Sequence, residues 1–213
     1  MNMKNRLLSI VLILVFSASF AIAQEKSKVS FGILGGVNFQ NLNGKLSSGD
    51  KLKNDMLLGF HGGFNVQLPI AAGFYVQPGL MFATKGAKDT YTLLGSEFTN
   101  EIKINYIEMP LNLVYKASLG NGFFMLGFGP YLAYGISGKQ VFEGKDLTFE
   151  RGVDYNALDA GGNIFAGFET GSGLFLQLDT QFGMLNIYAD DNSNNDQATA
   201  KNTGFGLSIG YRF

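Results

Sequence analysis

The sequence predicts an all-β protein: an eight-stranded antiparallel up-and-down transmembrane β-barrel with short periplasmic turns and long extracellular loops. Three observations support this fold class. Apolar residues alternate with small or polar ones over eight separate segments, which is the period of a β-strand with two unlike faces. The connections between these segments are alternately short and long. The 213 residues include 29 Gly and 20 Phe, and only 15% are charged, against about 25% in soluble domains.

The first 24 residues are typical of a secretory signal. Lys4 and Arg6 precede an apolar run, which ends in small residues up to Ala23. We expect cleavage between Ala23 and Gln24, so that residues 1–23 are a cleavable signal peptide and residues 24–213 the barrel domain. The alternative is a retained helical anchor, since the apolar run nearly reaches the roughly 17 residues that span a bilayer. The Ala-x-Ala ending favours cleavage.

Composition excludes several classes of function. The chain has no Cys, which rules out disulfides, thiolate metal sites and a lipid-modified N-terminal cysteine. Its formal net charge of −1 offers no basis for binding nucleic acid. After the signal, polar residues or Gly interrupt each apolar run, so a membrane-embedded chain would have to cross as a barrel.

Eight segments are predicted to be membrane-spanning strands. In the first, Val29, Phe31 and Ile33 share the outward face. In the fourth, the alternation changes phase near Tyr106 and Ile107, as a β-bulge would produce. The segments exceed or match the 9 to 11 residues, roughly, that a tilted strand needs, and their even number suits a single-chain barrel. They comprise residues 29–39, 58–68, 74–85, 102–116, 123–137, 158–170, 174–183 and 204–213.

The connections predict the orientation of the barrel. Short turns are expected at 68–73, 117–122 and 170–173, and long polar connections at 40–55, 86–101, 138–156 and 189–201. Short turns are typical of the periplasmic side, so both termini are expected there. Aromatic residues gather near the strand ends, as in the two interfacial belts of membrane barrels. They are Phe39, Phe82, Tyr106, Tyr134 and Tyr188 on the loop side, and Phe74, Tyr115, Phe124, Tyr211 and Phe213 on the turn side.

A soluble antiparallel barrel of the lipocalin kind would show the same period. Its large apolar residues would point inward, and its outer face would carry charge for solubility. Here the second face consists mainly of Gly, Ala, Ser, Asn and Gln. This face has too little charge for a soluble exterior, but its small residues suit the narrow interior of eight strands.

Several ionisable residues are predicted to point into the lumen. One interpretation is a polar lumen that ions or small solutes traverse, and the other is a network of ion pairs that plugs it. The plug is favoured because eight strands leave a narrow interior in which charges persist only when paired. Arg212 is expected to pair with Asp179 on the neighbouring strand. The predicted lumen network comprises His61, Glu108, Lys116, Asp159, Glu169, Asp179 and Arg212.

The sequence predicts neither catalysis nor a cofactor. His61 is the single His, and without an evident Ser and acid partner at the same height it is a poor general base. A weak candidate for calcium is the loop "DDNSNNDQ", which lacks the Gly and distal Glu of an EF-hand and is otherwise a solvated loop. Its possible ligands are Asp190, Asp191, Asn192, Asn194 and Asp196.

Three stretches carry a resemblance to a known family. "YIEMPLNLVYK" (106–116), "GFGPYLAYGISGK" (127–139) and "AGGNIFAGFETGSGLFLQLDTQFGMLNI" (160–187) resemble the outer-membrane β-barrel domain family common in Bacteroidota, often called porin family or PorT-like. The resemblance implies an eight-stranded barrel in the cell outer membrane of a Gram-negative envelope. It also implies that the terminal strand, with Tyr211 and Phe213, is read by the barrel-assembly machinery.

Three classes of function follow from this reading. The leading one is a structural or interaction barrel with a largely plugged lumen, whose long external loops contact outer-membrane lipid, lipopolysaccharide, or an extracellular or secretion-system protein. The second is a narrow porin-like pore for small solutes. The third is a membrane-embedded lipid-modifying enzyme.

Overall fold

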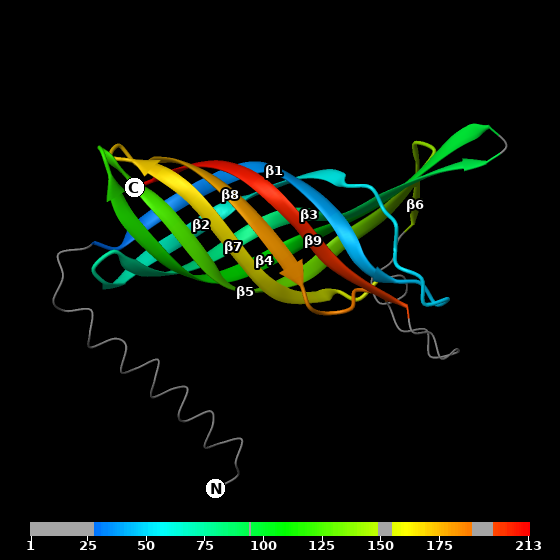
Figure 1. Ribbon diagram of the computed structural model, residues 1–213, viewed down its shortest axis with the longest axis horizontal. Helices are drawn as coiled ribbons and strands as arrows, with labels where there is room; N and C mark the ends of the chain where they lie inside the picture. Colours follow the sequence, from blue (N-terminus) through cyan, green and yellow to red (C-terminus); the bar gives the residue numbers. More distant parts are fainter. Residues whose placement is uncertain (1–27, 94, 149–154, 189–197) are drawn as a thin grey trace, which may run out of the picture.

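The computed structural model describes residues 28–93, 95–148, 155–188 and 198–213 (Figure 1). The predicted signal and its cleavage site at Ala23 and Gln24 lie outside these residues. No helix in the described part of the chain is long and apolar enough to cross a membrane. The strands are β1 (Ser30–Lys45), β2 (Leu57–Ala71), β3 (Phe74–Leu93), β4 (Ser96–Leu119), β5 (Gly122–Phe142), β6 (Lys145–Thr148), β7 (Leu158–Thr170), β8 (Leu174–Gly183) and β9 (Thr199–Arg212).

Eight of these strands close into an antiparallel barrel. Around the sheet the order is β4, β3, β2, β1, β9, β8, β7 and β5, and pairing of β4 with β5 closes the ring. The first and last strands pair from Gly32↔Arg212 to Lys45↔Thr199. The predicted eight-stranded up-and-down barrel is therefore confirmed, and β6 is an additional strand that pairs with β5 outside it.

The two ends of the barrel differ (Figure 1). We call the end with the short β2–β3, β4–β5 and β7–β8 connections and the C-terminus the turn end, and the opposite one the loop end. At the loop end β3 and β4 pair as far as Leu93↔Ser96. The prediction of a polar connection at 86–101 is thus wrong: this segment is mostly a two-stranded ribbon. It projects beyond the apolar band and carries only a few apolar side chains, among them Tyr91 and Phe98, between charged, amide and hydroxyl ones, so no continuous period-2 pattern is visible there.

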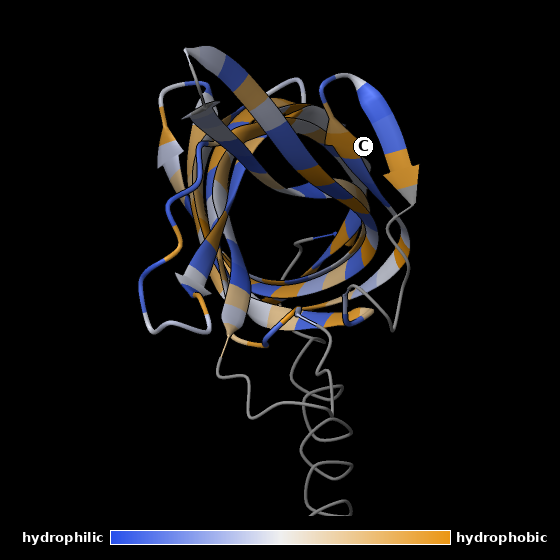
Figure 2. Ribbon diagram, turned by 90° about the vertical axis from the view of Figure 1, so that its right-hand side faces the viewer, coloured by the Kyte–Doolittle hydropathy of each residue, from blue (hydrophilic) through white to orange (hydrophobic). Residues whose placement is uncertain are grey.

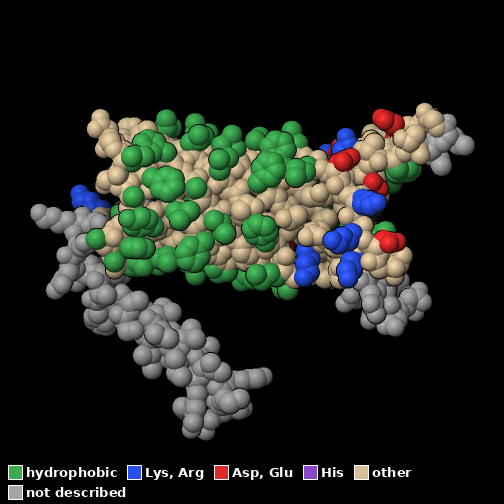
Figure 3. All heavy atoms as spheres, viewed as in Figure 1, with side chains coloured by type: hydrophobic (Ala, Val, Ile, Leu, Met, Phe, Trp, Pro, Cys, Tyr) green, Lys and Arg blue, Asp and Glu red, His purple; other side chains and the backbone are tan. Residues whose placement is uncertain are grey.

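The outward face of the barrel is an apolar band. Figure 3 shows hydrophobic side chains over this part of the surface, with Lys, Arg, Asp and Glu gathered at the loop end. Cross-strand ring pairs reinforce the band, such as Phe39–Phe205 with centroids 5.1 Å apart and Phe74–Tyr115 at 4.9 Å. Viewed along the barrel, hydrophilic and hydrophobic residues alternate along the strands (Figure 2). This is the surface expected of a barrel in lipid.

The bulge lies on β5 rather than β4. The β4–β5 register shifts where Asn105 pairs with Ser137 and Tyr106 with Gly135, which leaves Ile136 as the extra residue. In β4, Ile104, Tyr106 and Glu108 are all buried in succession at alternate positions. The predicted phase change near Tyr106 and Ile107 is therefore wrong, and so is the place of Tyr106 in an interfacial belt. Apolar residues of β4 turn inward near the loop end, and this mimics a change of phase.

Candidate functional site

The candidate site is the interior of the barrel, which is filled in layers from the loop end to the turn end. The first layer is an apolar cluster that the sequence did not predict. Its largest members, Tyr106, Tyr131 and Tyr155, are each 2% exposed or less. This cluster closes the lumen at the loop end with aromatic and aliphatic side chains. The cluster consists of Leu42, Ala87, Ile104, Tyr106, Tyr131, Ala133, Tyr155, Ile187 and Ala200.

Below this cluster, Lys85 is the centre of a buried charged network. Its Nζ lies 2.7 Å from Glu108 Oε2 and 3.4 Å from Asp159 Oδ2, and 4.1 Å from the centroid of the Tyr131 ring. Tyr131 and Asn202 donate hydrogen bonds to the same Asp159 oxygen, at 3.2 and 3.0 Å. The ammonium is fully buried, so its two carboxylate partners compensate for the water it has lost.

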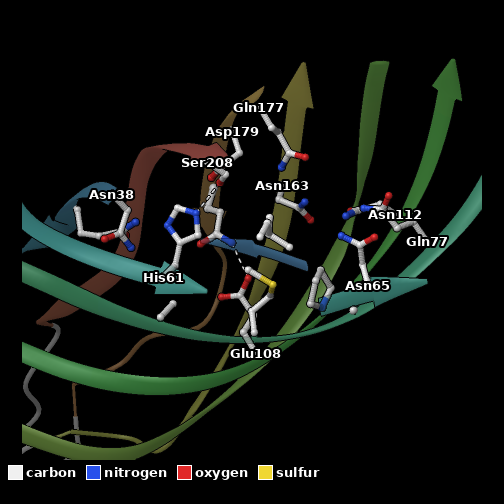
Figure 4. Close-up of a pocket in the computed structure, with 17 residues that line it drawn as sticks. Asn38, His61, Asn65, Gln77, Glu108, Asn112, Asn163, Gln177, Asp179 and Ser208 are labelled. Carbon is white, nitrogen blue, oxygen red and sulfur yellow. Dashed lines mark hydrogen bonds between the residues drawn. The ribbon is translucent and has the colours of Figure 1, made fainter. Parts of the chain in front are cut away.

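A polar cavity of about 60 Å³ lies at the centre of the lumen (Figure 4). Side chains from around the barrel line it, including Asn38, Gln40, Asn112 and Asn163. The side-chain oxygens of these four residues are buried and have no hydrogen-bond partner among the described residues. Buried acceptors of this kind are normally satisfied by ordered water, and the cavity has room for a few molecules.

His61, Ser208 and Asp179 converge at the wall of this cavity (Figure 4). His61 Nε2 and Ser208 Oγ are 2.6 Å apart and share a hydrogen bond. A Cβ added at Gly206 would lie 2.9 Å from Asp179 Oδ1 and 3.1 Å from His61 Cε1, so the carboxylate and the ring share one neighbourhood. The prediction that His61 lacks a Ser and an acid at its height is wrong.

The geometry of this trio limits its chemistry. A Ser–His hydrogen bond is the contact that activates a serine nucleophile. However, charged and apolar layers close the cavity on both sides, and its volume of about 60 Å³ admits water rather than an acyl or glycosyl substrate. The contact ties β2 to β9 across β1.

The last charged layer lies at the turn end and is centred on Glu169. Its carboxylate accepts hydrogen bonds from Lys116 Nζ at 2.7 Å and Arg212 Nε at 2.9 Å. Arg212 also donates to Asn65 Oδ1 at 3.0 Å. The predicted pair of Arg212 with Asp179 is wrong, because the β8–β9 register places Asp179 opposite Gly206 and leaves Arg212 beyond the Leu174↔Tyr211 pair.

Inward glycines make room for inward phenylalanines in this part of the lumen. A Cβ at Gly127 would lie 2.3 Å from the Phe165 ring, and one at Gly210 would lie 2.2 Å from Phe175 Cζ. Both rings are 2% exposed and pack with Val114 and Met125. The small residues predicted to face the lumen therefore leave space for large rings from neighbouring strands, and these rings fill the interior.

All seven residues of the predicted network lie on the inward face of the barrel, in three separate groups. The sequence reasoning missed Lys85, although its position on the face of Gln77 and Ala83 would have revealed it. It also missed Tyr131 and Asn202. The alternation of the sequence places both side chains on the inward face. It does not show that both contact Asp159, because the three residues come from three different strands.

The predicted metal ligands are not tested by the structure. The candidate calcium ligands Asp190, Asp191, Asn192, Asn194 and Asp196 lie outside the described residues. Within those residues, no group of three or more His, Asp or Glu side chains is arranged to hold a metal ion.

The two predicted assembly-signal residues, Tyr211 and Phe213, point outward at the turn end with their rings 4.9 Å apart. The Phe213 amide donates a hydrogen bond to Phe31 O at 2.8 Å.

Sequence comparison identifies the family. Residues 22–189 match the outer membrane protein beta-barrel domain family. The chain belongs to this family. Together with the fold, this membership places the protein in the outer membrane. No curated protein is significantly similar to it in sequence.

Several solved outer-membrane proteins have a related fold. Ail, the attachment invasion locus protein of Yersinia pestis, is 13% identical, with 88% of this chain and 100% of Ail covered and a TM-score of 0.42. Neisserial surface protein A is 10% identical over the same shares, with a TM-score of 0.48. OprG from Pseudomonas aeruginosa is 15% identical, with 86% and 95% covered and a TM-score of 0.44. At such identities the likeness concerns the fold alone.

Proposed function

We propose that this outer-membrane barrel is a closed membrane anchor that presents its loop end to a protein partner outside the cell. In this proposal both termini and the turn end face the periplasm. The observation that carries it lies beyond the apolar band at the loop end. There β5 pairs with the β4 side of the two-stranded ribbon, and β6 pairs with β5, so that the ribbon becomes a four-stranded sheet. Tyr91 stacks on Phe98 with centroids 5.7 Å apart, and Phe98 on Phe142 at 6.4 Å.

An aromatic row in water is a typical interaction surface. Tyr91 is 42% exposed, and the exposed Lys139–Asp146 pair lies on the β5–β6 part of the same ribbon. Aromatic side chains surrounded by charged ones resemble the centre and the rim of protein interfaces. The ribbon supplies such a surface without any contribution from the lumen.

The layers inside the barrel argue against a pore and an enzyme. The apolar cluster, the Lys85 network and the Glu169 network each bridge strands across the interior, and open channels belong to much larger barrels of about 16 to 18 strands. We therefore propose that the protein neither conducts solutes nor modifies lipids. Its partners would be membrane lipid, lipopolysaccharide and the barrel-assembly machinery, besides the protein bound at the ribbon.

Photo-crosslinking in intact cells tests the interaction. A photoreactive amino acid at Tyr91 is expected to form protein adducts of defined size, whereas the same group at Asn121 in the β4–β5 turn is not. As a matched control, a Phe98→Ala, Phe142→Ala double variant keeps the photoreactive group at position 91 but removes the two other rings of the row. It should weaken those adducts and leave the barrel folded. Equal labelling from both positions, or none from Tyr91, would contradict the proposal.

Planar-bilayer recording of the refolded mature chain tests the closed lumen. The wild type is expected to conduct no ions. A Glu108→Ala, Arg212→Ala double variant is expected to leak, because it removes one charged partner from each of the two charged layers. Discrete conductance steps in the wild type would instead support the narrow pore.

A further inference from the structure

Three prolines lie side by side in the membrane-spanning wall. Pro78 on β3 pairs with Leu111, and Pro110 on β4 pairs with Tyr131. A proline has no N–H to give to a neighbouring strand, and it is unusual within a sheet. Pro130 on β5 completes the row.

Each proline coincides with a break in the ladder. Within the described strands, pairing of β2 with β3 skips the segment that contains Pro78, pairing of β3 with β4 skips Pro110, and pairing of β4 with β5 skips Pro130. The skipped segments lie between Asn65↔Gly79 and Leu68↔Val76, between Pro78↔Leu111 and Met81↔Glu108, and between Pro110↔Tyr131 and Leu113↔Phe128.

An apolar groove lies outside the third break. Its volume is about 680 Å³, and its lining includes Leu111, Phe128, Pro130, Ile164 and Phe182. Gly162 of β7 also lines it, and because Gly162 has no side chain the outer surface is hollow there. Along β5 the groove lies between two outward aromatic residues, Phe124 towards the turn end and Tyr134 towards the loop end. It is therefore at mid-depth in the apolar band.

The position and the chemistry of the groove indicate its occupant. At mid-depth the outward face of the barrel meets the hydrocarbon tails of the membrane. A volume of 680 Å³ falls within the range of about 300–1,000 Å³ for small-molecule pockets. The wall of a second barrel is convex and would leave such a hollow unfilled, whereas a flexible chain can follow it.

We propose that the groove between β4, β5 and β7 is a binding site for one acyl chain of an outer-membrane lipid. The breaks at Pro110 and Pro130 shape the wall beneath it, and Gly162 leaves it open. The site depends on the barrel being in a membrane and not on the ribbon at the loop end, so loss of the ribbon interaction would leave it unaffected.

Photolabelling from the lipid tests this site. The refolded mature chain is placed in phospholipid bilayers with a small fraction of phospholipid that carries a diazirine in mid-chain, and the adducts are located by mass spectrometry. We expect several-fold more adducts on Leu111, Phe128 and Ile164 than on outward residues of β1 and β2, such as Val37 and Phe64. An even distribution around the barrel would overturn the proposal.

Two glycine variants give a matched comparison. A Cβ at Gly162 has its nearest neighbour, Gly129 O, at 3.9 Å, and a Cβ at Gly35 on the opposite wall has His61 O at 3.7 Å, so both positions have space for a side chain. Gly162→Leu is expected to reduce groove labelling several-fold, whereas Gly35→Leu leaves it unchanged. Unchanged labelling in Gly162→Leu would contradict an acyl-chain site. If Gly162→Leu does not fold, the wild-type adduct map alone decides.

Discussion

Arg212, next to the C-terminus, contacts Glu169 through its Nε at 2.9 Å and so joins β9 to β7 across β8. Lys116 of β4 holds the same carboxylate at 2.7 Å. One anion thus connects three strands, including the last strand of the chain. All three side chains are less than 10% exposed, so their charges depend on each other rather than on water.

Glu169→Ala is expected to lower the free energy of unfolding by about 3–5 kcal/mol, because it leaves two buried cations without a partner. Urea unfolding in lipid vesicles measures the change. Asp146→Ala is the control: it breaks the exposed pair with Lys139, and such pairs contribute about 0–1 kcal/mol. Wild-type stability in Glu169→Ala would show that the turn-end layer does not hold the strands together.

Lys85→Met keeps an unbranched side chain but leaves Glu108 and Asp159 without their cation. We expect a loss of stability of several kcal/mol, about the cost of breaking a buried ion pair. Adding Glu108→Gln and Asp159→Asn removes the uncompensated charges and is expected to restore most of the loss. If the triple variant were no more stable than Lys85→Met, packing rather than charge would explain the effect.

The orientation of the barrel can be read with single cysteines, since the chain has none of its own. Thr92→Cys in the ribbon is expected to react with a membrane-impermeant maleimide in intact cells. Ser172→Cys, in the short β7–β8 turn, is expected to react only after the outer membrane is permeabilised. The opposite result would place the termini outside the cell.

Phe213→Ala is expected to reduce the amount of assembled barrel more than Phe205→Ala does. Phe205 lies within the last strand and stacks on Phe39, whereas Phe213 is 70% exposed. The expectation rests on the proposal that the assembly machinery recognises the Phe213 ring. Heat-modifiable gel mobility of membrane fractions measures the folded amount. Equal losses would mean that Phe213 is an ordinary interfacial aromatic.

Strand identity and the inward or outward direction of side chains follow from local sequence. The two faces of β7 show this: Asp159, Asn163 and Glu169 are buried, and Leu158 and Ile164 are exposed. A strand alternates its side chains whatever its neighbours are, and lipid makes the contrast between the faces strong. The ribbon at 86–101 escaped prediction because it stands in water and carries too few apolar residues to form a continuous apolar face.

The sequence by itself therefore determined the eight barrel strands, the apolar outer band and the inward position of the charged residues. Only the tertiary structure decided which inward residues meet, as with Arg212 and Glu169, Lys85 and Asp159, or His61 and Ser208. These partners come from strands that are not neighbours, and their heights depend on the stagger with which the barrel closes. The ladder that joins β1 to β9, from Gly32↔Arg212 to Lys45↔Thr199, fixes that stagger.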